Sequence, residues 1–127
     1  MKFLFALLLS LSSLSALALD EVECTGVNTD SNQIRFSIEQ GWSSSIRDAR
    51  LLVYSSTETD PEETIYRISS VRGRIGRMYY TGSDGIRLEV DLFPDRTPRW
   101  GRYYNSSLSA SYGRIGTLNC RFPQVRP

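Results

Sequence analysis

Arginines placed beside aromatic residues across a glycine are the side chains of this sequence best suited to binding chemistry. Residues 74–80 resemble residues 99–104 in this respect, and residues 113–116 repeat the first half of the pattern. Guanidinium groups form paired hydrogen bonds to carboxylates and phosphates, and they stack on aromatic rings. The pattern therefore indicates a surface for an anionic partner or for a sugar. The candidate binding patch comprises Arg74, Arg77, Tyr79, Arg99, Trp100, Arg102 and Tyr103.

The same pattern has a simpler structural explanation. In a chain rich in hairpins, glycines mark bends at the beginnings of strands, and surface arginines are solvated or paired with carboxylates at little gain in stability. Trp42, which follows Gly41, is open to the same two interpretations, because it can extend a binding surface or close one end of a core. The sequence leaves both interpretations open.

The acidic residues near Pro61 are a candidate for cation binding. Their carboxylates belong to Glu58, Asp60, Glu62 and Glu63. The spacing lacks the ligand positions and the central glycine of a calcium-binding loop. We therefore expect a solvated hairpin tip and no metal site.

Glu89 and Asp91 are a candidate pair for catalysis. They face the same side of a predicted strand at a separation of about 6.5 to 7 Å, which suits a pair of catalytic carboxylates. An alternating polar face explains them as well, because every half-exposed strand has one. We expect no catalytic residues here.

Missing residue types exclude several other activities. The sequence contains no His, and its only Lys is Lys2, in a segment expected to be removed. This excludes a Ser nucleophile with a His base, Schiff-base chemistry and imidazole metal ligands. Gly73, Gly76 and Gly82 do not match a phosphate-binding or dinucleotide-binding loop. We predict a protein that is not an enzyme and that uses no cofactor.

Residues 1–18 have the features of a signal peptide. Lys2 gives a basic start, residues 3–9 are uniformly apolar, and residues 16–18 form a small-x-small cleavage site. The apolar run is too short to span a membrane, and Cys24 lies well beyond the predicted cut, so it is not the first mature residue of a lipoprotein. We expect a single domain of residues 19–127, in the periplasm or secreted, without membrane insertion.

Cleavage after Ala18 leaves equal numbers of positive and negative side chains. Only Lys2 is lost from the 15 Lys and Arg residues, which leaves 14 arginines against 14 Asp and Glu residues. A neutral domain has no overall field that attracts nucleic acid or an anionic membrane. Any electrostatic binding must therefore come from local clusters of charged side chains. We do not expect nucleic acid as a partner.

Cys24 and Cys120 are the only cysteines and lie near the two ends of the predicted mature chain. Thiols are oxidised in exported proteins, so we predict that the two residues form a disulfide. In the chain-entropy model, closing so long a loop destabilises the unfolded state by roughly 4 to 5 kcal/mol. The first and last strands must then lie side by side or face each other.

Short alternating segments broken by turn residues indicate an all-β domain. The clearest alternation places Ile86, Leu88, Val90 and Leu92 on one face of a strand, after a hairpin turn at Asp84 and Gly85. The segments with strand character, which we expect to form seven or eight strands, are residues 22–26, 34–38, 49–55, 64–70, 78–81, 86–92, 102–105, 107–112 and 115–122. Residues 93–98 contain two prolines and are predicted to form a loop.

Residues 44–54 also fit an amphipathic helix with a capping box at Ser45 and Asp48. We favour a strand, because residues 51–54 are consecutive and bulky, as in a strand covered on both faces. The density of strands predicts a small antiparallel β-barrel or β-sandwich of seven to eight strands. A disulfide between neighbouring end strands closes a barrel, whereas one between facing strands joins the sheets of a sandwich, and the spacing leaves both open.

The stretch Tyr79-Tyr80-Thr81-Gly82-Ser83-Asp84-Gly85, together with the early and late cysteines, resembles the membrane-bound and periplasmic inhibitors of C-type lysozyme. The barrels of that family present a loop to the lysozyme cleft, so the resemblance implies inhibition through this region. It covers about fifteen residues. The family's Trp-x-x-Lys-Gly stretch is replaced here by Ile86-Arg87-Leu88-Glu89-Val90, so its functional residues do not transfer to this chain.

These observations predict an exported, non-enzymatic binding protein of the cell envelope or extracellular space, whose partner is a protein or a glycan. An inhibitor or protein-binding module gathers the candidate patch on one exposed face, whereas a glycan binder lays the same aromatics in a groove. A structural envelope protein instead has scattered, paired arginines. A carboxylate-based hydrolase requires Glu89 or Asp91 in a cleft.

Overall fold

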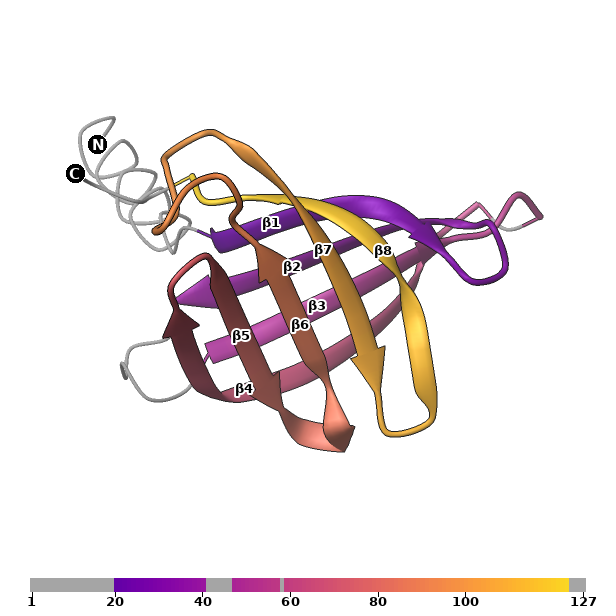
Figure 1. The fold of residues 1–127 in the computed structure, drawn as a ribbon. Helices are drawn as coiled ribbons and strands as arrows, with labels where there is room; N and C mark the ends of the chain where they lie inside the picture. The colour runs from indigo at the N-terminus through magenta and orange to yellow at the C-terminus, as the bar shows by residue number, and fades with distance from the viewer. Residues whose placement is uncertain (1–19, 41–46, 58, 124–127) are drawn as a thin grey trace, which may run out of the picture.

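The computed structural model describes residues 20–40, 47–57 and 59–123, which form a closed antiparallel β-barrel of eight strands (Figure 1). Each strand pairs with its neighbour in sequence, and the last pairs with the first. The structure thus confirms the all-β prediction and selects the barrel over the sandwich. The strands are β1 (Asp20–Asn28), β2 (Gln33–Gln40), β3 (Arg47–Tyr54), β4 (Glu62–Arg74), β5 (Arg77–Gly82), β6 (Arg87–Asp91), β7 (Tyr103–Ala110) and β8 (Gly113–Arg121), with a short 3₁₀ turn η1 (Ser83–Gly85).

The inside of the barrel is a packed hydrophobic core, as the alternation of the strands predicts. Leu88 and Val90 of β6 are completely buried, and so are Ile34, Phe36 and Ile38 of β2. Their sequence neighbours on these strands face outwards, because successive side chains of a strand point to opposite faces. The apolar positions of each strand therefore determine which face is the outer one.

The predicted disulfide joins β1 to β8 where the barrel closes. Cys24 and Cys120 are direct partners in the register of these two strands, with their Cα atoms 4.0 Å apart. Gly26 of β1 lies close to the same junction, and a Cβ atom there would be 2.0 Å from the carbonyl oxygen of Thr117. The first and last strands are thus held together by a covalent bond and by close backbone packing.

Besides the length of β4, which is described below, two strand predictions differ from the structure. The segments predicted at residues 102–105 and 107–112 are one continuous strand, β7, which ends at Ala110 before a turn. The chain does not break at Ser106, because this residue pairs with Val90 of β6 and with Leu118 of β8. The other difference is in β3, where Leu51 faces the core but Leu52 is only half-buried on the outside, so this strand is covered on one face only.

A β-bulge in β4 decides which side chains this strand presents outside the barrel. The register to β5 shifts between Ile68 and Ser70. Before the bulge, Ile68 faces the core, and after it Val71 packs against the core. A bulge re-aims the residues that follow it, so the positions facing outwards beyond it are even-numbered. The predicted strand, which ends at Ser70, continues to Arg74.

The β4–β5 turn and the long β6–β7 connection lie at the same end of the barrel as the beginning of β1, and we call this the loop end (Figure 1). Two backbone hydrogen bonds join the turn to the connection. Gly76 N–H donates to the Arg96 carbonyl oxygen at 3.1 Å, and Leu92 N–H donates to the Gly76 carbonyl oxygen at 2.8 Å. The turn at Gly76 is therefore joined to the connection that carries Arg99 and Arg102.

Several sequence-based expectations concern residues outside the part of the chain described here. These are the signal peptide at residues 1–18, Trp42 and Glu58. Among the described residues, no helix has the length and apolar character needed to cross a membrane. The remaining acidic residues near Pro61 are exposed, and β4 begins within this group, at Glu62.

Tyrosine ionisation offers a test of the core packing. Burial, followed by a hydrogen bond to Tyr112, raises the pKa of Tyr66 from 10.0 to about 12. Because the folded state favours the neutral phenol, the associated stability is complete below about pH 10 and is lost as the pH rises towards about 12. Burial also raises the pKa of Tyr80 and of Tyr104, so we expect phenolate absorbance to show one late-titrating tyrosine fewer in Tyr66→Phe than in the wild type. Titration of all tyrosines near their ordinary pKa in the folded protein would contradict this packing.

Candidate functional site

The outer face of β4, β5 and β6 gathers basic and hydroxyl side chains from three neighbouring strands. On β4 and β5, Ser70 is the register partner of Thr81, and Arg72 is the partner of Tyr79. On the next strand, Arg87 is the partner of Thr81. The antiparallel pairing of β4, β5 and β6 therefore brings together residues that lie up to seventeen positions apart in the sequence.

These side chains line an open groove of about 470 Å³. The arginines in it are exposed, whereas Tyr79 and the two hydroxyl residues are partly buried. The strands beneath are held by the barrel's hydrogen-bond ladder, so the groove has a fixed floor. We call it the arginine groove, and it is lined by Ser70, Arg72, Arg74, Tyr79, Thr81 and Arg87.

The arginines of this groove have no acidic partner among the residues described by the structure. Arg87 instead lies over the ring of Tyr79, with its guanidinium carbon 5.1 Å from the ring centre. This cation–π contact orients one guanidinium group without neutralising it. By contrast, ion pairs within the described part of the chain engage Arg47, Arg50, Arg77, Arg99, Arg102 and Arg121.

Arg77 lies on β5 beside the groove and interacts with Tyr79 of its lining, but unlike the groove arginines it has an acidic partner. Its guanidinium group is 3.1 Å from the Glu89 carboxylate. The hydroxyl of Tyr79, and then the carboxylate of Glu89, raise the pKa of Arg77. This residue of the candidate patch is therefore already paired, whereas Arg74 and Tyr79 line the groove.

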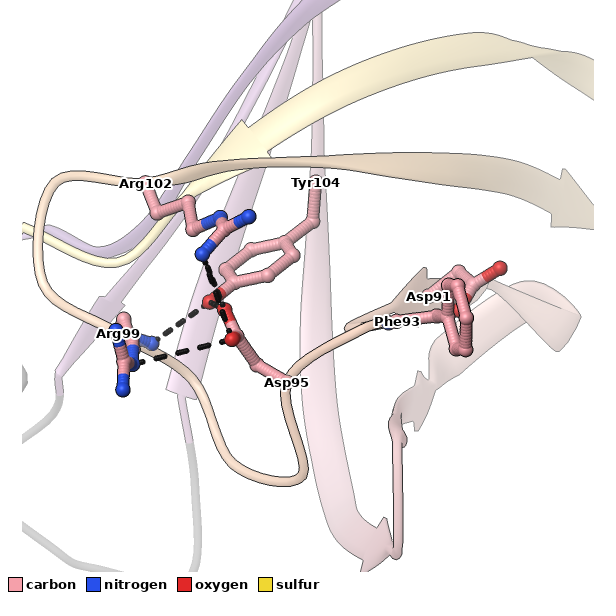
Figure 2. A network of polar contacts seen from close by, with 6 residues as sticks. All are labelled: Asp91, Phe93, Asp95, Arg99, Arg102 and Tyr104. Atoms are coloured by element: carbon pink, nitrogen blue, oxygen red, sulfur yellow. Dashed lines mark hydrogen bonds and ion pairs between the residues drawn. The ribbon is translucent and has the colours of Figure 1, made fainter.

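The other half of the predicted patch is built around a carboxylate (Figure 2). Asp95 is only 12% exposed and lies 3.3 Å from the guanidinium group of Arg102 and 3.8 Å from that of Arg99. The hydroxyl of Tyr104 donates a hydrogen bond to Asp95 at 2.7 Å and accepts one from the Arg99 backbone N–H at 2.9 Å. These arginines hold the β6–β7 connection in place, as the simpler explanation of the pattern requires.

The two aromatic residues of this half both contact the end of β8 or the residues that follow it. Trp100 is 71% exposed, and its indole N–H donates a hydrogen bond to the Pro123 carbonyl oxygen. Tyr103 lies on β7, where the Arg121 guanidinium carbon is 6.0 Å from its ring centre. In the described part of the molecule, no hydrogen bond, ion pair or ring contact joins this half of the patch to Arg74, Arg77 or Tyr79.

Tyr103 and Arg121 line a second groove, of about 210 Å³, on the opposite strands of the barrel. Here Arg121 is 2.8 Å from Glu23, and Arg50 is 3.7 Å from Glu63. Cys24 of the disulfide contributes to the lining. Since carboxylates already engage two of its arginines, this groove is less suited than the arginine groove to an anionic ligand.

The carboxylates considered for catalysis are both engaged in contacts within the fold. Glu89 pairs with Arg77, and Asp91 accepts a hydrogen bond from the Phe93 backbone N–H at 3.1 Å (Figure 2). Neither lines the arginine groove or the second groove. Among the residues whose positions are described, no group of three potential metal ligands occurs.

The predicted patch lacks Ser70, Thr81 and two arginines of the arginine groove, Arg72 and Arg87. The alternation of the strand that contains Leu88 places Arg87 on its polar face. The position of Arg72 could not be predicted, because it lies beyond the predicted end of its strand and its outward position depends on the bulge after Ile68. The registers of β4 to β5 and of β5 to β6 are the information that would have placed Arg72 and Arg87 near Tyr79.

Comparisons with known proteins bear on the fold alone. No family model matches the chain, and no curated protein does. Among solved structures, the chain is similar to a de novo designed fluorescence-activating β-barrel, with 22% sequence identity and a TM-score of 0.43. The alignment covers 85% of this chain and 96% of the designed one. The function of this chain therefore has to be inferred from its own residues.

Proposed function

We propose that this chain is an exported, non-enzymatic protein of the cell envelope or extracellular space that binds an anionic partner in the arginine groove. The observation that carries this proposal is the position of Arg72, Arg74 and Arg87 around one groove without an acidic partner among the described residues. Export is supported by the signal-like segment in the sequence and by the disulfide between Cys24 and Cys120.

The electrostatics of the groove favour an anion over a neutral ligand. Three like charges repel one another, and an anion placed between them relieves this repulsion. Guanidinium groups also form bidentate hydrogen bonds that orient a carboxylate, sulfate or phosphate. Because Arg87 is held against the Tyr79 ring, part of the binding geometry exists before the ligand arrives. Such preorganisation lowers the entropic cost of binding.

Alanine substitutions test this proposal. We expect Arg72→Ala and Arg87→Ala each to weaken binding to heparin, used as a general polyanion, by about tenfold or more, since a hydrogen bond to a charged group contributes about 1.5 to 3 kcal/mol. Arg114→Ala serves as the matched control, because Arg114 is exposed on β8, lacks an ion pair to any described residue and lies outside the groove. Affinity should be measured by titration calorimetry at fixed salt.

Equal loss in the Arg114→Ala control would show that only the overall charge matters. Unchanged binding by the Arg72→Ala and Arg87→Ala proteins would exclude the arginine groove as the site. Either result contradicts the proposed function.

A protein partner at the loop end is a second candidate, favoured by two exposed apolar residues. Ile75 is 83% exposed and Phe93 is 82% exposed. Their backbones lie close together, because Leu92 N–H donates a hydrogen bond to the Gly76 carbonyl oxygen. Exposed apolar residues next to arginines are common in protein interfaces. If Phe93→Asp and wild type recover the same proteins from an envelope extract, this candidate is rejected.

A further inference from the structure

We infer that the ligand of the arginine groove is an acidic polysaccharide, a polymer of sugars carrying carboxylate groups. This inference rests on the proposed function and specifies its ligand. It is carried by three features of the groove, namely the absence of aliphatic side chains from its lining, the hydroxyl groups beside the arginines, and the distribution of positive charge over two strands, β4 and β6.

The lining of the groove is unlike the centre of a protein interface. It contains one aromatic ring, from Tyr79, and no aliphatic side chain, whereas the buried centres of protein interfaces are depleted in charge and enriched in apolar residues. The exposed apolar residues Ile75 and Phe93 lie on the loop-end connections and are not part of this lining. The groove thus lacks the apolar centre that would bind a peptide or a protein surface.

The hydroxyl groups of Ser70 and Thr81 suit a sugar ligand. These residues are register partners on β4 and β5 and are partly buried in the groove. A hydroxyl can both donate and accept a hydrogen bond, as can the hydroxyls of a sugar. The ring of Tyr79 adds an apolar surface with a polar end beside them. A sugar ring has hydroxyl groups at its edges and apolar C–H groups on its faces. The hydroxyl groups can therefore hydrogen-bond to Ser70 and Thr81, and a C–H face can pack on the ring of Tyr79.

The positions of the charges suit a polymer with repeated anionic groups. Arg72 and Arg74 alternate along β4, so their backbones are about 6.5 to 7 Å apart. Arg87 lies two strands away, at roughly 10 Å across the sheet. Because the groove is open to solvent, a chain can cross it and continue beyond. Several acidic sugar units can then contact several arginines, which a single small anion does less well.

Binding of matched polymers tests this inference. The probes are polygalacturonate, poly-L-glutamate as a peptide polyanion, and dextran as an uncharged polysaccharide, each titrated calorimetrically into wild-type protein at the same salt concentration. We expect polygalacturonate to bind at least tenfold more tightly than poly-L-glutamate, and dextran to bind more weakly than both. Polygalacturonate binding should also fall in Arg72→Ala.

Hydroxyl substitutions add a test that leaves the charge unchanged. We expect Thr81→Val combined with Ser70→Ala to weaken polygalacturonate binding by about fivefold, since a neutral hydrogen bond contributes about 0.5 to 1.5 kcal/mol. Thr117→Val, on the exposed face of β8 and outside the groove, is the control. The comparison of polymers with wild-type protein needs no substitution, so it decides the matter even if a variant does not fold.

The outcomes separate this inference from the proposed function. If poly-L-glutamate binds as tightly as polygalacturonate, and Arg72→Ala weakens both, the polysaccharide inference is overturned while the anion-binding function stands. If neither polymer binds in a manner that depends on Arg72, both are overturned. Dextran binding as tight as that of polygalacturonate would show that charge is not recognised, and would also overturn both.

Discussion

Replacing both Cys24 and Cys120 with Ser is expected to lower the free energy of unfolding by about 4 to 5 kcal/mol. The two residues are 96 positions apart in sequence and are direct register partners on β1 and β8. The disulfide thus restricts nearly the whole described chain in the unfolded state. A loss of this size is a large share of the stability of a small domain.

Urea denaturation of the oxidised wild type, the reduced wild type and the double Ser variant measures this effect. The reduced protein is the control, because it lacks the bond without any change of side-chain shape. We expect the reduced wild type and the variant to be destabilised to a similar extent. A difference of less than about 1 kcal/mol between oxidised and reduced protein would contradict the view that this bond is the main constraint on barrel closure.

Ile68→Ala and Ile65→Ala should differ strongly, although both residues lie on β4. Ile68 is fully buried, whereas Ile65 is 54% exposed on the outer face. Truncating a buried isoleucine removes apolar contacts and leaves a cavity, at a cost of about 2 to 5 kcal/mol. The exposed position should change stability by no more than about 0.5 kcal/mol.

Thermal or urea denaturation of the two variants tests the register of β4 before its bulge. A shift of one residue in a strand exchanges the inner and outer faces. If Ile65→Ala were the more damaging substitution, the inner and outer faces of this strand would be assigned the wrong way round.

Sequence patterns were sufficient for the all-β class, because its determinants are local. Two of these determinants are the alternation at Leu88 and Val90 and the turn before it. Each involves only neighbouring residues and does not depend on the tertiary structure. The pairing of Cys24 with Cys120 followed from their number and from the chemistry of exported proteins. Together with the density of strands, these features limited the fold to two architectures, and the direct pairing of β1 with β8 decides between them.

The candidate patch was predicted only in part, because its members are brought together by long-range pairing. Arg74 and Tyr79 do share a groove, as the sequence pattern suggested. Arg99 and Arg102 instead pair with Asp95, which lies on the same β6–β7 connection (Figure 2). The local spacing of the sequence does not show how this connection folds back towards β7. Arg72 faces the groove only because of the bulge in β4, and the sequence contains no clear pattern that predicts this bulge.

The rigid part of the fold therefore carries the proposed site, while the loop end carries paired charges and exposed apolar residues. Sites built on strands keep their geometry better than sites on loops. In this protein, the hydrogen-bonded strands β4, β5 and β6 fix the spacing of the arginines, and the Tyr79 ring orients one of them. This arrangement favours recognition of a preformed pattern of negative charges.

Nuclear magnetic resonance of the arginine side chains tests the central claim most directly. Isotope-labelled protein is titrated with a short oligogalacturonate, and the guanidinium N–H resonances are followed residue by residue. The arginine groove predicts large shifts for Arg72, Arg74 and Arg87, and small ones for Arg99 and Arg102, which Asp95 already engages. Shifts centred on the loop end, with the groove arginines unchanged, would contradict the claim.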